Sequence, residues 1–143
     1  MNLGLFSCLF MMKRNDKYYE NIEDLSGLSK NHPLISLSLL IILFSLAGIP
    51  PMAGFFAKFY VFTAVIKESM YFLAITGLLS TVISAFYYLR IIKIIYFDPE
   101  KEKYDTDYNI GLKVTLSLST LLIFLYFIFP SRLVEIVSRI NII

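Results

Sequence analysis

The sequence has very little of the chemistry that builds metal sites and covalent cross-links. Among its 143 residues there is one cysteine, Cys8, and one histidine, His32. A single cysteine excludes an intrachain disulfide and any all-cysteine metal or iron-sulfur site. A single histidine likewise excludes a histidine cluster. We therefore expect no metal site in this chain.

Charged residues are also scarce, making up 17% of the chain with a net charge of +2. The basic residues form no Lys/Arg stripe, and no nucleic-acid motif is present, so we expect no nucleic-acid partner. Apolar residues dominate instead, at 57% of the chain with a mean hydropathy of +0.70. They are gathered in long blocks, and this arrangement is typical of an integral membrane protein.

The apolar blocks lie at residues 34–66, 70–89 and 112–130. A membrane-crossing helix needs about 20 apolar residues, so we predict an all-α membrane fold with three transmembrane helices. Polar stretches at residues 13–33 and 90–111 are predicted to be loops on one side of the membrane. Lys67 and Glu68 mark a tight turn on the other side.

Both ends of the chain are apolar but too short to span a membrane. Residues 1–12 would form a helix only about 18 Å long, which predicts the second half of a transmembrane helix. A short interfacial or signal-like start is the alternative. Residues 131–143 place apolar side chains at helical spacing opposite Arg132, Glu135 and Arg139. This pattern predicts an amphipathic helix at the membrane interface or on a neighbouring protein.

The distribution of Lys and Arg predicts the orientation of the chain. The two long loops, 13–33 and 90–111, carry four each, whereas the turn at Lys67 has one and the tail has two. Basic loops stay preferentially on the inner side of the membrane. Both long loops should therefore face the bacterial cytoplasm or the mitochondrial matrix.

The first apolar block is too long for one straight helix. Residues 34–66 would extend about 50 Å as a helix, whereas the hydrocarbon core is about 30 Å thick. Within the block lie Gly48, Pro50, Pro51 and Gly54. Proline has no amide hydrogen, so the carbonyl groups four residues earlier, near residues 46 and 47, lose their helical partners. We predict two half-helices joined by a short irregular link.

Lys58 is the only charged residue inside this block. It lies about 14 Å along the helix axis from Lys67 at the predicted membrane edge, and a lysine side chain reaches only about 6 Å. A cation in that position is costly, so intramembrane ionisable residues are candidates for ion or proton transfer. We interpret Lys58 as a proton relay. The alternative is a fixed lysine held by the carbonyl groups of the link or by an acid on another chain.

Four further residues are candidates for the same path. Arg90 and Lys93 follow the second span and are either interface anchors or path residues. Tyr87 and Tyr88 precede them, and their hydroxyl groups either bond within the protein or order water.

Several segments resemble a known family. The run Leu-Ala-Gly-Ile-Pro-Pro-Met-Ala-Gly-Phe-Phe-Ala-Lys-Phe-Tyr at residues 46–60 resembles the broken-helix signature of the antiporter-like proton-pumping subunits of respiratory complex I. The match is best with the subunit N group, which is called subunit 2 in mitochondria. Residues 2–4, 23–28 and 87–90 also look like that group, so the resemblance covers nearly the whole chain.

The resemblance implies that the chain is the carboxy-terminal portion of a fourteen-helix subunit of NADH:ubiquinone oxidoreductase, an H⁺-translocating enzyme. Residues 34–66 would be its broken twelfth helix, and Lys58 would lie on the outlet side of the proton route. The family's other key groups, a glutamate and two lysines on earlier helices, would lie outside this chain. NADH, FMN, iron-sulfur clusters and ubiquinone would be bound elsewhere in the complex.

Partners and location follow from the same resemblance. The partners would be the missing amino-terminal part of the subunit on another chain, neighbouring membrane subunits and lipid. A composition rich in Ile, Phe, Tyr, Lys and Asn suits an AT-rich mitochondrial genome. Met1 would be either the start of one piece of a split gene or a break in a longer protein. We therefore expect a multi-pass protein of the mitochondrial inner membrane, or of the plasma membrane if the source is bacterial. The rivals are a cation/proton antiporter or membrane-bound hydrogenase subunit, and a purely structural membrane fragment.

Overall fold

The computed structural model describes residues 1–14, 17–18, 21–50, 52–99 and 109–128. The predicted amphipathic tail at residues 131–143 and Pro51 of the predicted link lie outside these residues. The elements follow one another in the order α1 (Asn2–Met11), β1 (Lys13–Arg14), β2 (Lys17–Tyr18), η1 (Ile22–Leu25), α2 (Leu28–Asn31), α3 (Pro33–Ala47), α4 (Ala53–Lys67), α5 (Tyr71–Phe97) and α6 (Ile110–Ile128).

The prediction of an all-α fold is confirmed. Within the described ranges, the only sheet is the antiparallel pair β1–β2, in which Lys13 lies opposite Tyr18. Between it and α3, the loop predicted at residues 13–33 contains the helical turns η1 and α2. Leu25 and Leu28 on these turns are buried, so this end of the loop packs onto the helices.

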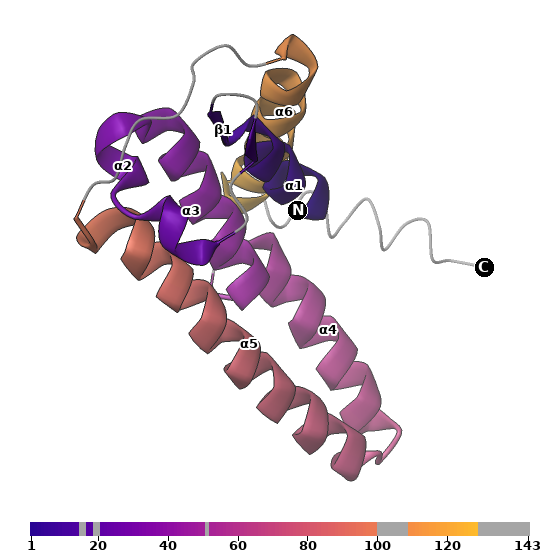
Figure 1. Ribbon diagram of the computed structural model, residues 1–143. Helices are drawn as coiled ribbons and strands as arrows, with labels where there is room; N and C mark the ends of the chain where they lie inside the picture. The colour runs from indigo at the N-terminus through magenta and orange to yellow at the C-terminus, as the bar shows by residue number, and fades with distance from the viewer. Residues whose placement is uncertain (15–16, 19–20, 51, 100–108, 129–143) are drawn as a thin grey trace.

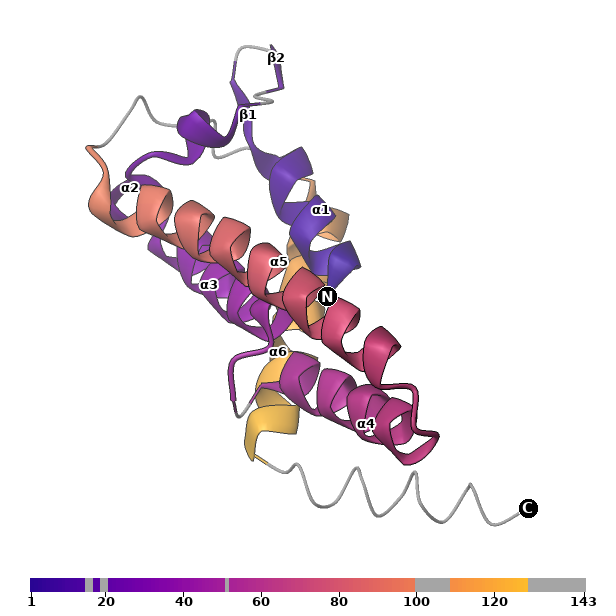
Figure 2. The same cartoon turned by 90° about the horizontal axis from the view of Figure 1, so that it is seen from below.

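The helices are arranged in two parts (Figures 1 and 2). Helices α1, α3 and α6 pack against one another, while α4 and α5 form an antiparallel hairpin that runs away from them. Helix α5 is long enough to lie beside both α4 and α3. Figure 1 places β1, α2 and the start of α6 at one end of the molecule and the α4–α5 turn at the opposite end. This arrangement agrees with long loops on one side of a membrane and a tight turn on the other.

The core lies where α3 meets α1, α5 and α6. Leu39, Ile42, Leu43 and Ile95 are almost completely buried there. Cys8 of α1 is also fully buried. A Cβ on Gly4 would lie 2.8 Å from Ser119 Cβ, so small residues allow α1 and α6 to approach closely. The short helix α1 is therefore covered by α3 and α6 of the same chain.

Helix lengths bear on the prediction of three membrane spans, the first of them discontinuous. In the part of the chain that the structure describes, α5 is the only helix both long and apolar enough to cross a membrane alone. Asn2–Met11 and Pro33–Ala47 are apolar but shorter. Helices α3 and α4 have 15 residues each. Each is thus about 22 Å long, less than the roughly 30 Å of a bilayer core.

Helix α5 also extends further than the predicted span of residues 70–89. It continues to Phe97, so Arg90 and Lys93 lie within the helix and not in a loop. Lys and Arg are good helix formers, and both side chains are exposed, so the charges do not end the helix. Pro99 disfavours a helical conformation at Asp98, where the helix ends.

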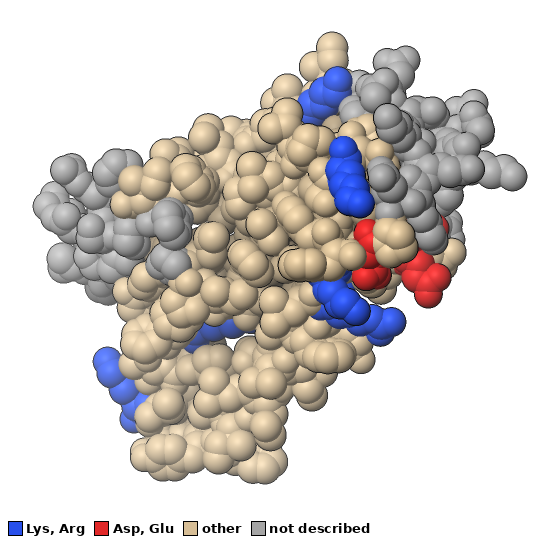
Figure 3. Space-filling model, turned by 90° about the vertical axis from the view of Figure 1, so that its left-hand side faces the viewer, with Lys and Arg blue, Asp and Glu red and all other residues tan. Residues whose placement is uncertain are grey.

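The surface matches the apolar composition. Figure 3 shows one face of the molecule, most of which is covered by uncharged side chains. The acidic side chains on this face gather at one end, and the basic ones lie at that end and near the opposite edge. A face of this kind suits contact with lipid or with apolar helices.

Candidate functional site

The site begins with the interruption between α3 and α4. Helix α3 ends at Ala47, and Gly48 follows with φ = +83°, a conformation that favours glycine. The Ile49 N–H donates to the Phe44 carbonyl oxygen at 3.1 Å, as in a Schellman motif. Helix α4 begins at Ala53 after an extended Met52. The chain thus ends one half-helix and begins another within residues 48–52.

Gly54 and Ser45 hold the two half-helices together. A Cβ on Gly54 would overlap the Ser45 carbonyl oxygen at 1.7 Å, so only glycine fits this crossing. The Gly54 N–H donates to Ser45 Oγ at 3.1 Å. Ser45 is completely buried, and its hydroxyl satisfies an amide at the start of α4 that has no partner within its own helix. The sequence pattern did not reveal this contact, because it joins two residues across the interruption.

Lys58 lies one turn into α4 and reaches back to the end of α3. Its ammonium nitrogen donates to the Leu46 carbonyl oxygen at 2.9 Å and to the Ala47 carbonyl oxygen at 3.2 Å. These are the two carbonyls whose helical partners would be the amides of Pro50 and Pro51, which have no hydrogen. The lysine thus occupies acceptors that the prolines leave open.

Gly48 allows the lysine to approach so closely. A Cβ on Gly48 would lie 3.1 Å from Lys58 Cδ and 3.2 Å from Lys58 Nζ. A larger residue would therefore push the ammonium away from the carbonyls. The predicted break residues Gly48 and Gly54 and the predicted relay Lys58 meet in one place.

A cavity of about 340 Å³ opens beside Lys58, between the end of α3 and the α4–α5 hairpin. Its walls are mainly apolar, and the polar side chains among them are Lys58, Thr63 and Thr81. The full lining is Ala47, Gly48, Phe55, Lys58, Phe59, Phe62, Thr63, Ile66, Leu78 and Thr81. Thr63 gave no signal in the sequence beyond its place in an apolar block.

The other predicted path residues lie elsewhere on α5. Arg90, Lys93 and Tyr87 are exposed, and Tyr88 is half-buried against the core. None of the four lines the cavity at Lys58. The structure therefore brings the break residues to Lys58 but does not bring these four residues to the same cavity.

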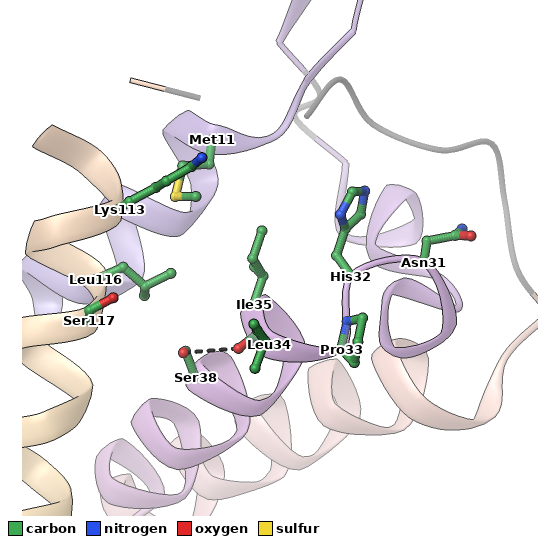
Figure 4. Close-up of a pocket in the computed structure, with 10 residues that line it drawn as sticks. All are labelled: Met11, Asn31, His32, Pro33, Leu34, Ile35, Ser38, Lys113, Leu116 and Ser117. Atoms are coloured by element: carbon green, nitrogen blue, oxygen red, sulfur yellow. Dashed lines mark hydrogen bonds between the residues drawn. The ribbon is translucent and has the colours of Figure 1, made fainter. Parts of the chain in front are cut away.

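A second cavity, of about 420 Å³, lies at the loop end of the molecule between α1, α3 and α6. Figure 4 shows Lys113 and Met11 on one side of it and His32 and Ile35 on the other. The hydrogen bond drawn there joins Ser38 Oγ to the Leu34 carbonyl oxygen at 3.0 Å, within α3. Among the described residues, no group of three or more His, Cys, Asp or Glu could hold a metal ion here or elsewhere.

Comparisons with known proteins agree on one family. Residues 1–84 match the family described as "NADH:quinone oxidoreductase/Mrp antiporter, TM". The chain is similar to NADH-quinone oxidoreductase subunit N of Pelagibacter ubique, with 79% identity over 143 residues, 100% of this chain and 30% of that protein. It is 45% identical over 134 residues to subunit N of Parvibaculum lavamentivorans, covering 94% of this chain and 28% of that protein.

The fold is similar to that of a chain in the structure titled "Respiratory complex I from Thermus thermophilus with bound Aureothin". The TM-score is 0.74 at 23% identity, over 90% of this chain and 30% of that chain. The present chain thus spans less than a third of the length of these relatives. The resemblance carried by residues 46–60 is confirmed. The family match covers more than half of the sequence, and so the chain belongs to the membrane-embedded NADH:quinone oxidoreductase/Mrp antiporter family.

Proposed function

We propose that the chain is the carboxy-terminal portion of a subunit N of NADH:quinone oxidoreductase, and that Lys58 relays protons there. The observation that carries this proposal is the contact of the Lys58 ammonium with the Leu46 and Ala47 carbonyl oxygens at the interruption of α3 and α4. The high identity to proteins named subunit N supports the choice of complex.

The position of Lys58 supports a role inside the membrane. Helices α3 and α4 are each about 22 Å long, so together they cross a bilayer core of about 30 Å only if the interruption lies well within it. Irregular backbone is tolerated at that depth where it is buried in protein or lines a hydrated cavity. An ammonium group at the same depth is costly and is a candidate for ion transfer.

The geometry around Lys58 allows its ammonium group to exchange a proton with water. An ammonium has three hydrogens to donate, and two carbonyl oxygens accept from Lys58 in the described residues. The cavity of about 340 Å³ lies beside the same side chain. In the proposed mechanism, a change in charge on a buried group outside this chain alters the proton occupancy of Lys58. The proton then leaves through water in the cavity.

The finer architecture is part of the same proposal. Helix α1 is the second half of one membrane helix, α3 and α4 are the halves of a broken one, and α5 and α6 are the two that follow, within a fourteen-helix subunit. The remainder of the subunit and neighbouring membrane subunits cover the exposed apolar faces. The chain itself binds no cofactor, and NADH, FMN, iron-sulfur clusters and quinone belong to other parts of the complex. As part of that complex it serves an H⁺-translocating NADH:quinone oxidoreductase.

The membrane is proposed to be a bacterial plasma membrane, because the relatives described above come from bacteria. The mitochondrial inner membrane and the split subunit stay predictions of the sequence. The loop between α1 and α3 and the loop after α5 are proposed to face the cytoplasm, following their Lys and Arg content.

A specific observation favours each of two alternatives. The family description includes Mrp antiporters, so a cation/proton antiporter or a related hydrogenase subunit is the first alternative. The second is a structural role, because two hydrogen bonds from a charged donor also fasten the end of α3 to α4.

The test replaces Lys58 by Met in the intact subunit within the assembled complex. Lys67→Met is the matched control, since Lys67 ends the same helix and is exposed. We expect Lys58→Met to lower the number of protons translocated per electron in vesicles, while Lys67→Met leaves it unchanged. Normal translocation by an assembled Lys58→Met complex would contradict the proposal. Loss of assembly without a selective transport defect would support the structural role.

A further inference from the structure

We propose that the cavity between α4 and α5 holds the water that exchanges protons with Lys58, and that Thr63 and Thr81 position this water. The inference rests on the proposed function of Lys58 and adds two positioning residues to it. Thr63 and Thr81 come from the two helices of the hairpin, and both are half-buried where they line the cavity.

The cavity extends from Lys58 towards the α4–α5 turn. Its lining on α4 runs from Phe55 past Lys58 and Thr63 to Ile66, one residue before the end of the helix. Thr63 lies five residues after Lys58, about 7.5 Å along the helix axis. That separation is too large for direct proton transfer, which needs about 2.6–3.2 Å between heavy atoms. Water must therefore bridge the distance if protons move this way.

The cavity has room for such a bridge. A water molecule occupies about 30 Å³ in the liquid, so the cavity volume of about 340 Å³ is ample for several. Buried water also needs two to four polar partners. Lys58, Thr63 and Thr81 are the side chains with polar atoms in the lining, and Phe55, Phe59 and Phe62 supply most of the apolar wall.

Both threonine hydroxyl groups act as hydrogen-bond donors within their own helices. Thr63 Oγ1 donates to the Phe59 carbonyl oxygen at 2.8 Å, and Thr81 Oγ1 donates to the Leu78 carbonyl oxygen at 2.7 Å. Each hydroxyl hydrogen is thus engaged with its own helix, and the oxygen lone pairs remain as acceptors. Both threonines therefore accept hydrogen bonds from water and fix its orientation. They do not carry the proton themselves.

Helices α4 and α5 pack closely at the edge of the cavity. A Cβ on Gly77 would lie 2.7 Å from Cε1 of Phe62, so the aromatic ring rests directly on Gly77. Thr81 follows Gly77 by about one helical turn on the same side of α5. The ring of Phe62 thus lies between α4 and α5 and forms part of the apolar wall of the cavity.

The experiment uses Thr63→Val with Thr81→Val in the intact subunit of the assembled complex. Valine keeps the shape of threonine and removes the acceptor oxygen. Thr76→Val is the matched control, because Thr76 lies on α5 outside the cavity lining and its hydroxyl bonds within the helix at 3.0 Å. The measurements are the rate of proton translocation in vesicles and its solvent deuterium isotope effect.

We expect the double variant to slow proton transfer about tenfold, the effect of losing one well-placed hydrogen bond, while Thr76→Val has no effect. The isotope effect should rise, and Thr63→Ser with Thr81→Ser should restore translocation, because serine returns the acceptor oxygen. A double valine variant that translocates like Thr76→Val, beside a Lys58→Met variant that does not, would overturn this inference and leave the function of Lys58 standing. Equal losses in the double variant and in Thr76→Val would also overturn it. Normal translocation by Lys58→Met would overturn both.

Discussion

The helices α1, α3 and α6 form what we call the packed end of the molecule. This packed end and the α4–α5 hairpin differ sharply in how well their side chains are buried. In the packed end, Leu39, Ile42 and Leu43 of α3 are at most 2% exposed. In the hairpin, Gly54 is the one buried residue of α4, and Phe72 of α5 is 83% exposed. The packed end is held by contacts within the chain, whereas the hairpin presents its apolar side chains to lipid or to other helices.

Lys58 lies at the join between these two regions. Its side chain belongs to α4, but its hydrogen-bond acceptors belong to α3. A well-packed α3 fixes the position of the carbonyls, and the loosely packed hairpin leaves space for a cavity beside the ammonium. The difference indicates that the packed end holds the acceptor carbonyls of Lys58 rigidly, while the hairpin gives water access to its ammonium group.

The largest effect is expected from Gly54→Ala. The new Cβ would collide with the Ser45 carbonyl oxygen, which is backbone and cannot move aside as a flexible side chain could. We expect the crossing of α3 and α4 to be destabilised by about 3 kcal/mol or more. The measurements are the amount of assembled complex in the membrane and its thermal midpoint.

Gly111→Ala is the control for this substitution. A Cβ there would meet only Asn109 Oδ1, at 3.4 Å, and alanine is the better helix former. Its effect should be neutral or slightly stabilising. If Gly54→Ala were as stable as Gly111→Ala, the close crossing of the half-helices would be wrong.

The next largest loss of stability is expected for Leu43→Ala, with Leu73→Ala as its matched control. Leu43 is 1% exposed in the packed end, and Leu73 is 54% exposed on the hairpin. Removing Leu43 leaves a cavity and should cost about 2–3 kcal/mol, whereas removing Leu73 should cost less than about 1 kcal/mol. Thermal denaturation of the purified complex measures both. Equal losses would mean that another helix of the complex covers Leu73 as tightly as the core covers Leu43.

Ser45→Ala should have a smaller effect than Leu43→Ala in the core. It removes the hydroxyl that accepts from the Gly54 N–H and leaves that buried donor unsatisfied, at a cost of about 1–2 kcal/mol. Ser38→Ala is the control, because Ser38 donates only to the Leu34 carbonyl oxygen within its own helix. A Ser38→Ala complex should melt at the unaltered temperature. Identical midpoints for the two variants would show that the Ser45 contact does not join the half-helices.

The sequence predicted the interruption because its cause is local. Glycine and proline act on the backbone within a few residues, so Gly48, Pro50 and Gly54 located the break without any knowledge of tertiary contacts. The isolated charge of Lys58 was equally visible in the sequence. The open carbonyls near residues 46 and 47 followed from the chemistry of proline, and both accept from Lys58.

The rest depended on contacts between segments. The bond between Ser45 and Gly54 joins residues whose sequence separation carries no periodic signal. The same holds for Thr63 and Thr81, which line one cavity from different helices. The end of α5 was placed too early because Arg90 and Lys93 suggested a membrane edge, whereas exposed cationic side chains continue a helix readily.

The most direct test of the central claim is Lys58→Arg in the assembled complex, measured as protons translocated per electron. Arginine keeps a positive charge and donors for the Leu46 and Ala47 carbonyl oxygens, but it does not release its proton in proteins. The account predicts a complex that assembles and reduces quinone but translocates fewer protons per electron. Full translocation by the arginine variant would show that a fixed cation is sufficient, and would contradict the relay role of Lys58.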